Sequence, residues 1–178
     1  MTQNAMNQTY ERFAMQILEN YDSAPYPALI GMQSRGVFLA KRIQAAAKKA
    51  SGMHLDFGVL DITFYRDDFR TKLKMPEVKV TDIPFDLYDR DIVLVDDVLF
   101  TGRTVRSAMS AILDYGRPRS IKFCCMVDRG HRELPIAPDF VGVVVPTKEN
   151  EEVRVRVLEM DSEDAVDVVE MTSDGGEV

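Results

Sequence analysis

Two adjacent carboxylates follow an apolar run in the middle of the chain, and a turn rich in hydroxyl groups comes after them. The apolar run is 92–95, the carboxylates are Asp96 and Asp97, and the turn is Thr101-Gly102-Arg103-Thr104. A carboxylate accepts two hydrogen bonds readily, which suits it to the vicinal hydroxyls of a sugar. It would repel a phosphate, so the acidic pair predicts a diol ligand.

The turn has the features of a phosphate site, because it opens a predicted helix. Apolar residues follow it at helical spacing, and Gly116 and Pro118 end the pattern. They are Val105, Ala108, Met109, Ile112 and Leu113. Backbone N–H groups in a first helical turn lack intrahelical acceptors and therefore point at an anion. Gly102 lets the backbone approach closely, and Thr101 and Thr104 add hydroxyl donors. A phosphate beside a diol describes a ribose 5-phosphate.

Two alternatives compete with the ribose phosphate interpretation. An apolar strand that ends in Asp-Asp is also typical of a magnesium site in P-loop nucleotide hydrolases. No Gly-x-x-x-x-Gly-Lys-Ser/Thr motif occurs in the sequence, which argues against that class. An ordinary strand-to-helix turn with solvated carboxylates stays open on spacing alone.

Strand-like and helical patterns alternate along the chain and indicate how these residues are positioned. Strands are predicted at 28–32, 55–65, 91–95, 120–127, 140–145 and 153–158, and apolar helical stripes at 10–21, 39–50 and 105–113. Residues 161–170 are expected to form a short helix or a strand end. This alternation predicts an α/β fold, a doubly wound and mostly parallel central sheet flanked by helices, with ligands at the strand carboxyl ends.

A second loop, 33–36, follows the first predicted strand and should lie at the same edge of the sheet. The Ser34 hydroxyl and Gly36 favour another backbone anion site, and the planar fork of Arg35 suits diphosphate oxygens. A helix start with a surface arginine is the open alternative. The charged segment 66–89 is long for a connection, which predicts a mobile functional loop or an excursion hairpin.

Several motifs resemble one family. The run Val95-Asp-Asp-Val-Leu-Phe-Thr-Gly-Arg-Thr104 resembles the phosphoribosyl diphosphate signature of type I phosphoribosyltransferases. Residues 61–68 (Asp-Ile-Thr-Phe-Tyr-Arg-Asp-Asp) and 127–135 (Val-Asp-Arg-Gly-His-Arg-Glu-Leu-Pro) resemble the PyrR family of pyrimidine operon regulators with uracil phosphoribosyltransferase activity. The resemblance covers about residues 28–157. It implies the type I phosphoribosyltransferase fold, with a mobile loop and a small hood region.

The resemblance also implies roles for individual residues. The catalytic group would be Asp96, Asp97 and Arg66, with Arg66 on the loop that closes over the site. The phosphoribosyl diphosphate and nucleotide site would comprise Ser34, Arg35, Gly36, Val98, Leu99, Phe100, Thr101, Gly102, Arg103 and Thr104. The base would lie against Asp128, Arg129 and Gly130. Mg²⁺ would arrive on the diphosphate without direct protein ligands, and its contacts with Asp96 or Asp97 would run through water.

The expected reaction converts uracil and 5-phosphoribosyl 1-diphosphate to uridine 5′-monophosphate (UMP) and diphosphate. An alternative or additional function is the binding of pyrimidine-leader mRNA, dependent on uridine nucleotide, through His131, Arg132 and Lys148. Acidic residues such as Glu11 and Glu19 in the first helix weaken that hypothesis relative to catalysis. A transferase for another nucleobase is the third alternative. His131 as a general base is disfavoured relative to a histidine without an acid–base role.

Composition predicts one domain over residues 1–178, with 172–178 as a disordered tail. Of the net charge of −7, residues 149–178 carry −9, from 11 acids and 2 arginines, so the body is nearly neutral. There is no signal peptide pattern and no apolar run long enough to span a bilayer. The adjacent Cys124 and Cys125 should point to opposite strand faces as reduced thiols. These features predict a cytoplasmic protein without membrane contact, and the family suggests a homodimer or higher homo-oligomer.

Overall fold

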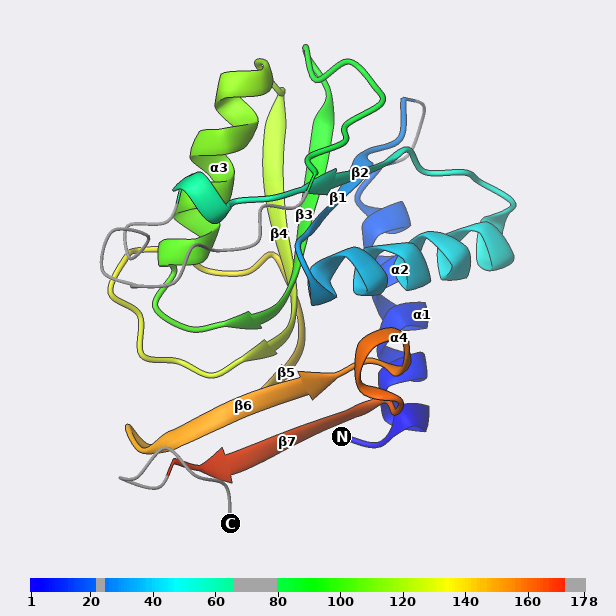
Figure 1. The fold of residues 1–178 in the computed structure, drawn as a ribbon. Coiled ribbons are helices and arrows are strands. Elements are labelled where there is room, and N and C mark those ends of the chain that lie inside the picture. The colour runs from blue at the N-terminus through cyan, green and yellow to red at the C-terminus, as the bar shows by residue number, and fades with distance from the viewer. Residues whose placement is uncertain (22–24, 66–79, 172–178) are drawn as a thin grey trace.

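The computed structural model describes residues 1–21, 25–65 and 80–171 (Figure 1). Its elements in chain order are α1 (Gln3–Glu19), β1 (Ala28–Met32), α2 (Arg35–Ser51), β2 (Phe57–Leu60), the 3-10 helix η1 (Thr63–Tyr65), β3 (Asp91–Leu99), α3 (Arg103–Tyr115), β4 (Ser120–Asp128), β5 (Phe140–Val144), β6 (Glu151–Arg156), α4 (Leu158–Asp161) and β7 (Ala165–Glu170).

Five parallel strands form the central sheet, in the order β2-β1-β3-β4-β5. Side chains alternate between the faces of a strand, so the sheet buries two apolar layers. Val93 and Val95 pack in the core with α1 and α2, whereas Ile92 and Leu94 pack in the core with α3. Figure 1 shows these helices on opposite sides of the sheet. The predicted doubly wound, parallel fold class is therefore confirmed.

The two cysteines follow the same alternation. Cys124 belongs to the core beneath α1 and α2, and Cys125 to the core beneath α3. Both are free and fully buried, and burial raises the pKa of each thiol above its ordinary value.

A small antiparallel hairpin forms the hood. Strands β6 and β7 pair from Glu151–Glu170 to Arg156–Ala165, and α4 lies in their connection. Figure 1 shows the hairpin beyond the carboxyl ends of β3 and β4, which is where the predicted site lies. The apolar side of the hairpin, including Val153 and Val166, joins the core beneath α1 and α2. The chain start is tied to β7, because the Met1 amino group donates to the Val166 carbonyl oxygen.

The prediction of one long strand over 55–65 was wrong. Strand β2 ends at Leu60, and η1 follows. The Asp61 carboxylate accepts hydrogen bonds from the Thr63 N–H and hydroxyl group at 2.9 and 2.5 Å, which turns the backbone. Beyond the undescribed residues 66–79, Asp82 forms an antiparallel bridge with Val59 on β2. The chain is thus at the sheet edge at Asp82, and most of the predicted loop 66–89 lies outside the described residues.

Strand β3 is longer than predicted, and the acidic pair lies inside it rather than in a turn. Apolarity ends at Val95, but pairing with β4 continues to the Leu99–Asp128 pair. The hydrogen-bonded ladder extends a strand regardless of side-chain polarity, because its bonds come from the backbone. Asp96 and Asp97 therefore have a strand's fixed backbone geometry.

Other predicted boundaries and core positions also change. Helix α1 begins at Gln3 with Thr2 as its N-cap, because the buried Met6 extends the apolar stripe toward the chain start. Leu113 belongs to the predicted apolar stripe of the helix but is 58% exposed near the end of α3. Residues 165–170 form a strand, β7, because they pair with β6. Among the described helices, none is long and apolar enough to cross a membrane.

Gly36 sets the distance between α2 and β3. A Cβ atom at this position would lie 2.4 Å from the Val95 carbonyl oxygen and 3.1 Å from the Asp96 Cα atom. Both neighbours are backbone atoms, so they cannot rotate away. The helix start therefore packs directly on the strand that carries the acidic pair.

Replacing Gly36 with alanine should push α2 off β3. We expect Gly36→Ala to lower the free energy of unfolding by about 1–3 kcal/mol, measured by urea denaturation. Ala50→Ser, at the exposed end of the same helix, is the matched control and should leave the midpoint unchanged. A wild-type midpoint for Gly36→Ala would contradict the close contact.

Candidate active site

The site lies where the strand order reverses. Strand β1 pairs with β2 on one side and β3 on the other, so chain direction across the sheet changes between β1 and β3. Ligands of open α/β sheets bind in the crevice outside the strand carboxyl ends at such a point. Loop 33–36 leaves β1 there, and loop 100–102 leaves β3. The fold thus brings together the two predicted anion loops.

The acidic pair on β3 is oriented by its own backbone. One carboxylate oxygen of Asp96 accepts a hydrogen bond from the Asp97 N–H, and one of Asp97 accepts from the Val98 N–H, both at 2.9 Å. Asp96 is buried and Asp97 is partly exposed. These contacts hold both carboxylates in fixed positions near the end of the strand, which suits them to the hydroxyls of a sugar.

The loop after β3 has the geometry predicted for a phosphate site. Gly102 adopts a left-handed conformation with φ 88° and is the N-cap of α3. A glycine cap has no side chain to bond the first N–H groups, which leaves their capping to the Thr101 hydroxyl or a ligand. The Thr101 Oγ1 atom lies 3.3 Å from the Arg103 nitrogen, and the Arg103 side chain pairs outward with Glu133.

Loop 33–36 begins α2, and its arginine is already held. The Gln33–Ser34 peptide is cis, and Ser34 is the N-cap residue of the helix. Arg35 donates from Nε and Nη2 to the two carboxylate oxygens of Asp161, at 3.2 and 2.7 Å. This pair raises the pKa of Arg35 and lowers the pKa of Asp161, so both are charged at neutral pH.

The predicted base-binding segment is a tight turn after β4. Gly130 and His131 are both left-handed, with φ 78° and 58°. The Asp128 carboxylate accepts from the Gly130 N–H and from Arg132. Burial alone would raise the Asp128 pKa, but these hydrogen bonds outweigh it and lower the pKa.

Arg132 points into the protein. Besides Asp128, it donates to three carbonyl oxygens that cross from this turn to the neighbouring loops. They belong to Phe100, Gly130 and Ile136. Its guanidinium is thus engaged by groups of the protein, and its predicted role in RNA binding stays a prediction.

Arg129 connects loop 100–102 to the hood. Its side chain is 7% exposed and lies over the Phe100 ring, with 4.1 Å between the guanidinium carbon and the ring centroid. It donates to the Thr147 hydroxyl and to the Glu151 carbonyl oxygen at the start of β6. The His131 Nε2 atom lies 2.6 Å from the Thr147 carbonyl oxygen. The turn therefore joins three segments that surround the site.

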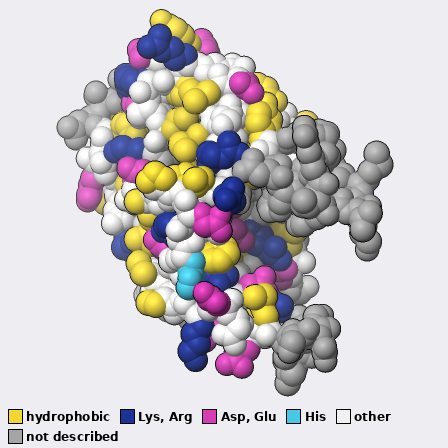
Figure 2. Space-filling model, turned by 90° about the vertical axis from the view of Figure 1, so that its left-hand side faces the viewer, with side chains coloured by type: hydrophobic (Ala, Val, Ile, Leu, Met, Phe, Trp, Pro, Cys, Tyr) yellow, Lys and Arg dark blue, Asp and Glu magenta, His cyan; other side chains and the backbone are white. Residues whose placement is uncertain are grey.

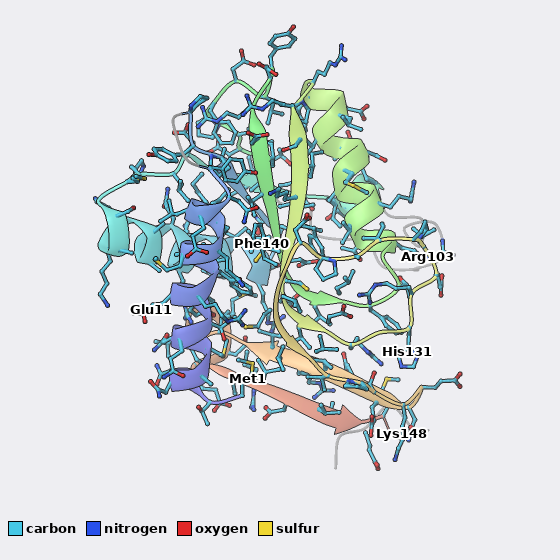
Figure 3. All side chains as sticks on the ribbon, turned by 180° about the vertical axis from the view of Figure 1, so that it is seen from behind. Met1, Glu11, Arg103, His131, Phe140 and Lys148 are labelled. Atoms are coloured by element: carbon cyan, nitrogen blue, oxygen red, sulfur yellow. The ribbon has the colours of Figure 1, made fainter. Side chains whose placement is uncertain are left out.

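Of the predicted RNA-facing residues, His131 and Lys148 are exposed. Figure 3 shows Arg103, His131 and Lys148 on one side of the molecule, from the start of α3 down to the hood. On the face in Figure 2, the described Lys and Arg side chains alternate with Asp and Glu rather than forming a broad basic field.

The predicted segments after β1, β3 and β4 lie at one edge of the sheet, and the structure places further residues, which the sequence patterns missed, beside them. Arg66 lies outside the described residues. Asp161 and Thr147 were not predicted, because nothing in their local sequence marks them. Asp161 stands among acids and pairs with an arginine 126 positions away. Only the position of the hood over the strand ends could have indicated it.

Comparison with known proteins agrees with this geometry. The family model described as "Phosphoribosyl transferase domain" matches residues 2–161. A "Bifunctional protein PyrR" of Elusimicrobium minutum is 44% identical over 169 residues, covering 95% of this chain and 94% of that protein. Another from Thermus aquaticus is 50% identical over 165 residues, covering 93% and 91%. The crystal structure of the hypoxanthine phosphoribosyltransferase of Trypanosoma cruzi superposes with a TM-score of 0.72 at 17% identity, covering 97% and 95%.

The chain belongs to the phosphoribosyl transferase domain family, and its fold agrees with that of the solved structure. Within that class the chain belongs to the PyrR family, as the motifs at 61–68 and 127–135 predicted.

Arg132 should be essential for the order of the turn. We expect Arg132→Ala to lower the free energy of unfolding by about 2 kcal/mol, because it leaves partly buried oxygen atoms without donors. Arg132→Lys should recover only a fraction, since an ammonium group lacks the planar fork. Urea denaturation measures both, and Arg103→Ala, which breaks an exposed pair, is the control.

The pair of Arg132 and Asp128 makes the free energy of unfolding depend on pH in a defined direction. Because the folded pKa of Asp128 is lowered, its contribution is present above its unfolded pKa of about 4 and is lost as pH falls through the folded value. The stability difference between wild type and Arg132→Ala should therefore shrink in acid, and a difference that grows would contradict the pair.

Proposed function

We propose that the protein transfers the phosphoribosyl group of 5-phosphoribosyl 1-diphosphate to uracil, giving UMP and diphosphate. The observation that carries this proposal is the pairing of β1 with β3, which carries the acidic pair: segments 33–36 and 100–104 follow these two adjacent parallel strands at the same edge of the sheet. A ligand that spans these loops has a ribose between two phosphate-bearing ends.

Each part of the site then has one task. Asp96 and Asp97 bind the ribose hydroxyls, and loop 100–104 binds the 5-phosphate through backbone N–H groups and the hydroxyls of Thr101 and Thr104. Loop 33–36, with Ser34, Arg35 and Gly36, binds the diphosphate. As the bond to diphosphate breaks, negative charge builds on the leaving group, and a fixed cation beside it lowers the barrier. Loop residue Arg66, outside the described residues, is proposed to add a second cation on closure.

We propose that Mg²⁺ enters this site bound to the diphosphate rather than through protein ligands of its own. Within the described residues, no group of three or more His, Cys, Asp or Glu side chains could hold a metal ion. The ion is proposed to take most of its ligands from phosphate oxygens and water, with Asp96 and Asp97 as the nearby carboxylates. When bound, it would neutralise part of the diphosphate charge.

Uracil is proposed to meet the turn at 128–130. The Asp128 and Arg129 side chains are engaged within the protein, so the base would contact main-chain atoms of the turn rather than these side chains. The turn lies within residues 127–135, which resemble a motif of the PyrR family. That resemblance favours uracil over a purine base.

A base panel tests the activity. Purified protein with phosphoribosyl diphosphate and Mg²⁺ should turn over uracil and leave hypoxanthine, guanine and xanthine unchanged. Asp96→Asn combined with Asp97→Asn should weaken phosphoribosyl diphosphate binding by at least about 100-fold, because two charge-assisted acceptors are lost. Calorimetry measures that loss. Wild-type affinity in the double variant would remove the ribose assignment, and turnover of a purine would correct the substrate.

A second candidate function is RNA binding dependent on uridine nucleotide. It is favoured by the exposure of His131 and Lys148 on the side of the site, and by the name "bifunctional" that the relatives carry. Glu149 and Glu151 follow Lys148 closely, so few phosphates would be neutralised.

A gel shift tests this second function. We expect pyrimidine-leader RNA to shift only with UMP present and only at low salt, and Lys148→Glu to abolish the shift. Lys48→Glu, on the exposed face of α2, is the charge-matched control. No shift in wild type, with uracil turnover intact, would restrict the protein to catalysis. We further propose that the protein acts in the cytoplasm, which its two free thiols support, and as a homodimer or higher homo-oligomer.

A further inference from the structure

The hood is attached to α2 by two arginines. Arg35 and Arg42 stand seven residues apart, two helical turns, and therefore lie on one face of the helix. Arg35 pairs with Asp161 at the end of α4. Arg42 pairs with Glu159 at 2.6 Å and with Asp164 at 2.8 Å. Of the two arginines, only Arg35 belongs to a proposed ligand-binding loop.

Asp161 is held rigidly by its own segment. Its Oδ2 atom accepts the Val157 N–H at 2.9 Å as well as the Nε–H of Arg35, and its Oδ1 atom accepts from Nη2. The carboxylate is 19% exposed. A carboxylate fixed by a backbone donor presents its oxygens in one orientation, so the planar guanidinium that it grips is fixed as well.

This grip leaves one edge of the Arg35 guanidinium for a ligand. A guanidinium has five N–H donors, and Asp161 engages two of them. Within the described part of the chain, Nη1 has no hydrogen-bond partner. The hydrogen bonds to Asp161 are the main cause of the raised pKa of Arg35, and the negative charge of Asp97 raises it further.

We propose that Asp161 is a positioning residue for diphosphate: it holds Arg35 with its Nη1 edge toward the site, so that the arginine is ordered before the ligand arrives. This inference rests on the proposed function, since it concerns the diphosphate end of the same ligand. A free arginine side chain loses rotamer freedom when a ligand fixes it. Asp161 removes that loss from the binding step and thereby raises affinity.

The test compares a ligand that carries diphosphate with one that does not. Asp161→Asn keeps the shape and removes the charge, so we expect it to weaken calorimetric binding of phosphoribosyl diphosphate with Mg²⁺ about tenfold. Binding of UMP, which has no diphosphate, should change less than twofold. Glu159→Gln is the matched control: it weakens the neighbouring hood contact to Arg42 and should leave both affinities within twofold of wild type.

A double-variant cycle shows whether Asp161 acts through Arg35. In an Arg35→Ala background, Asp161→Asn should cause no further loss, because the residue that it positions is absent. Asp161→Glu, which keeps the charge but moves it by one methylene, should lose affinity by an intermediate amount. Asp161→Glu still tests the inference if circular dichroism shows that Asp161→Asn is poorly folded.

Three results would overturn the inference. They are unchanged or tighter phosphoribosyl diphosphate binding in Asp161→Asn, an equal loss for UMP, and a full additional loss in the Arg35→Ala background. A wild-type protein that binds no phosphoribosyl diphosphate would instead overturn the proposed function, so the two failures are distinguishable.

Discussion

Parallel pairing between β1 and β3 is the constraint on which the site depends. The Gly31–Val95 pair places the end of β1 next to the acidic pair on β3, and Gly36 lets α2 start directly against β3. Two loops separated by more than sixty residues in the chain consequently lie at the same edge of the sheet. Each loop supplies a different part of the proposed binding site. The proposed catalysis therefore depends on the register between β1 and β3 as much as on side chains. The buried apolar alternation on both sheet faces maintains that register.

Local patterns predicted the elements of this site well, because each rests on a short-range rule. The strand of β3, the glycine at the start of α3 and the helical stripe behind it are properties of about twenty consecutive residues. Strand lengths were less predictable. β3 continues through Asp96 and Asp97 because β4 supplies its hydrogen-bond partners, whereas the apolar run after 57 stops at Leu60 where Asp61 turns the chain. Backbone pairing across the sheet decides such ends, and a single segment does not contain that information.

Three arginines show more clearly how little a local sequence says about the contacts of a side chain. Arg35, Arg129 and Arg132 all stand in motifs that indicate ligand contact, yet the structure gives them different tasks. Arg132 and Arg129 bind carbonyl oxygens inside the protein, and Arg35 keeps one edge for a ligand. Their partners come from distant positions, and several belong to the acidic C-terminal segment. That segment supplies the carboxylates Glu159, Asp161 and Asp164, which attach the hood to α2.

The adjacent cysteines give the molecule two built-in reporters of separate interiors. Cys124 and Cys125 are consecutive, but the sheet lies between their thiols, one beneath α1 and α2 and the other beneath α3. A thiol reagent reaches each only when the helix layer above it separates from the sheet, and a raised pKa keeps both unreactive until then. With one cysteine replaced at a time, the rate of modification would record the opening of one layer independently of the other.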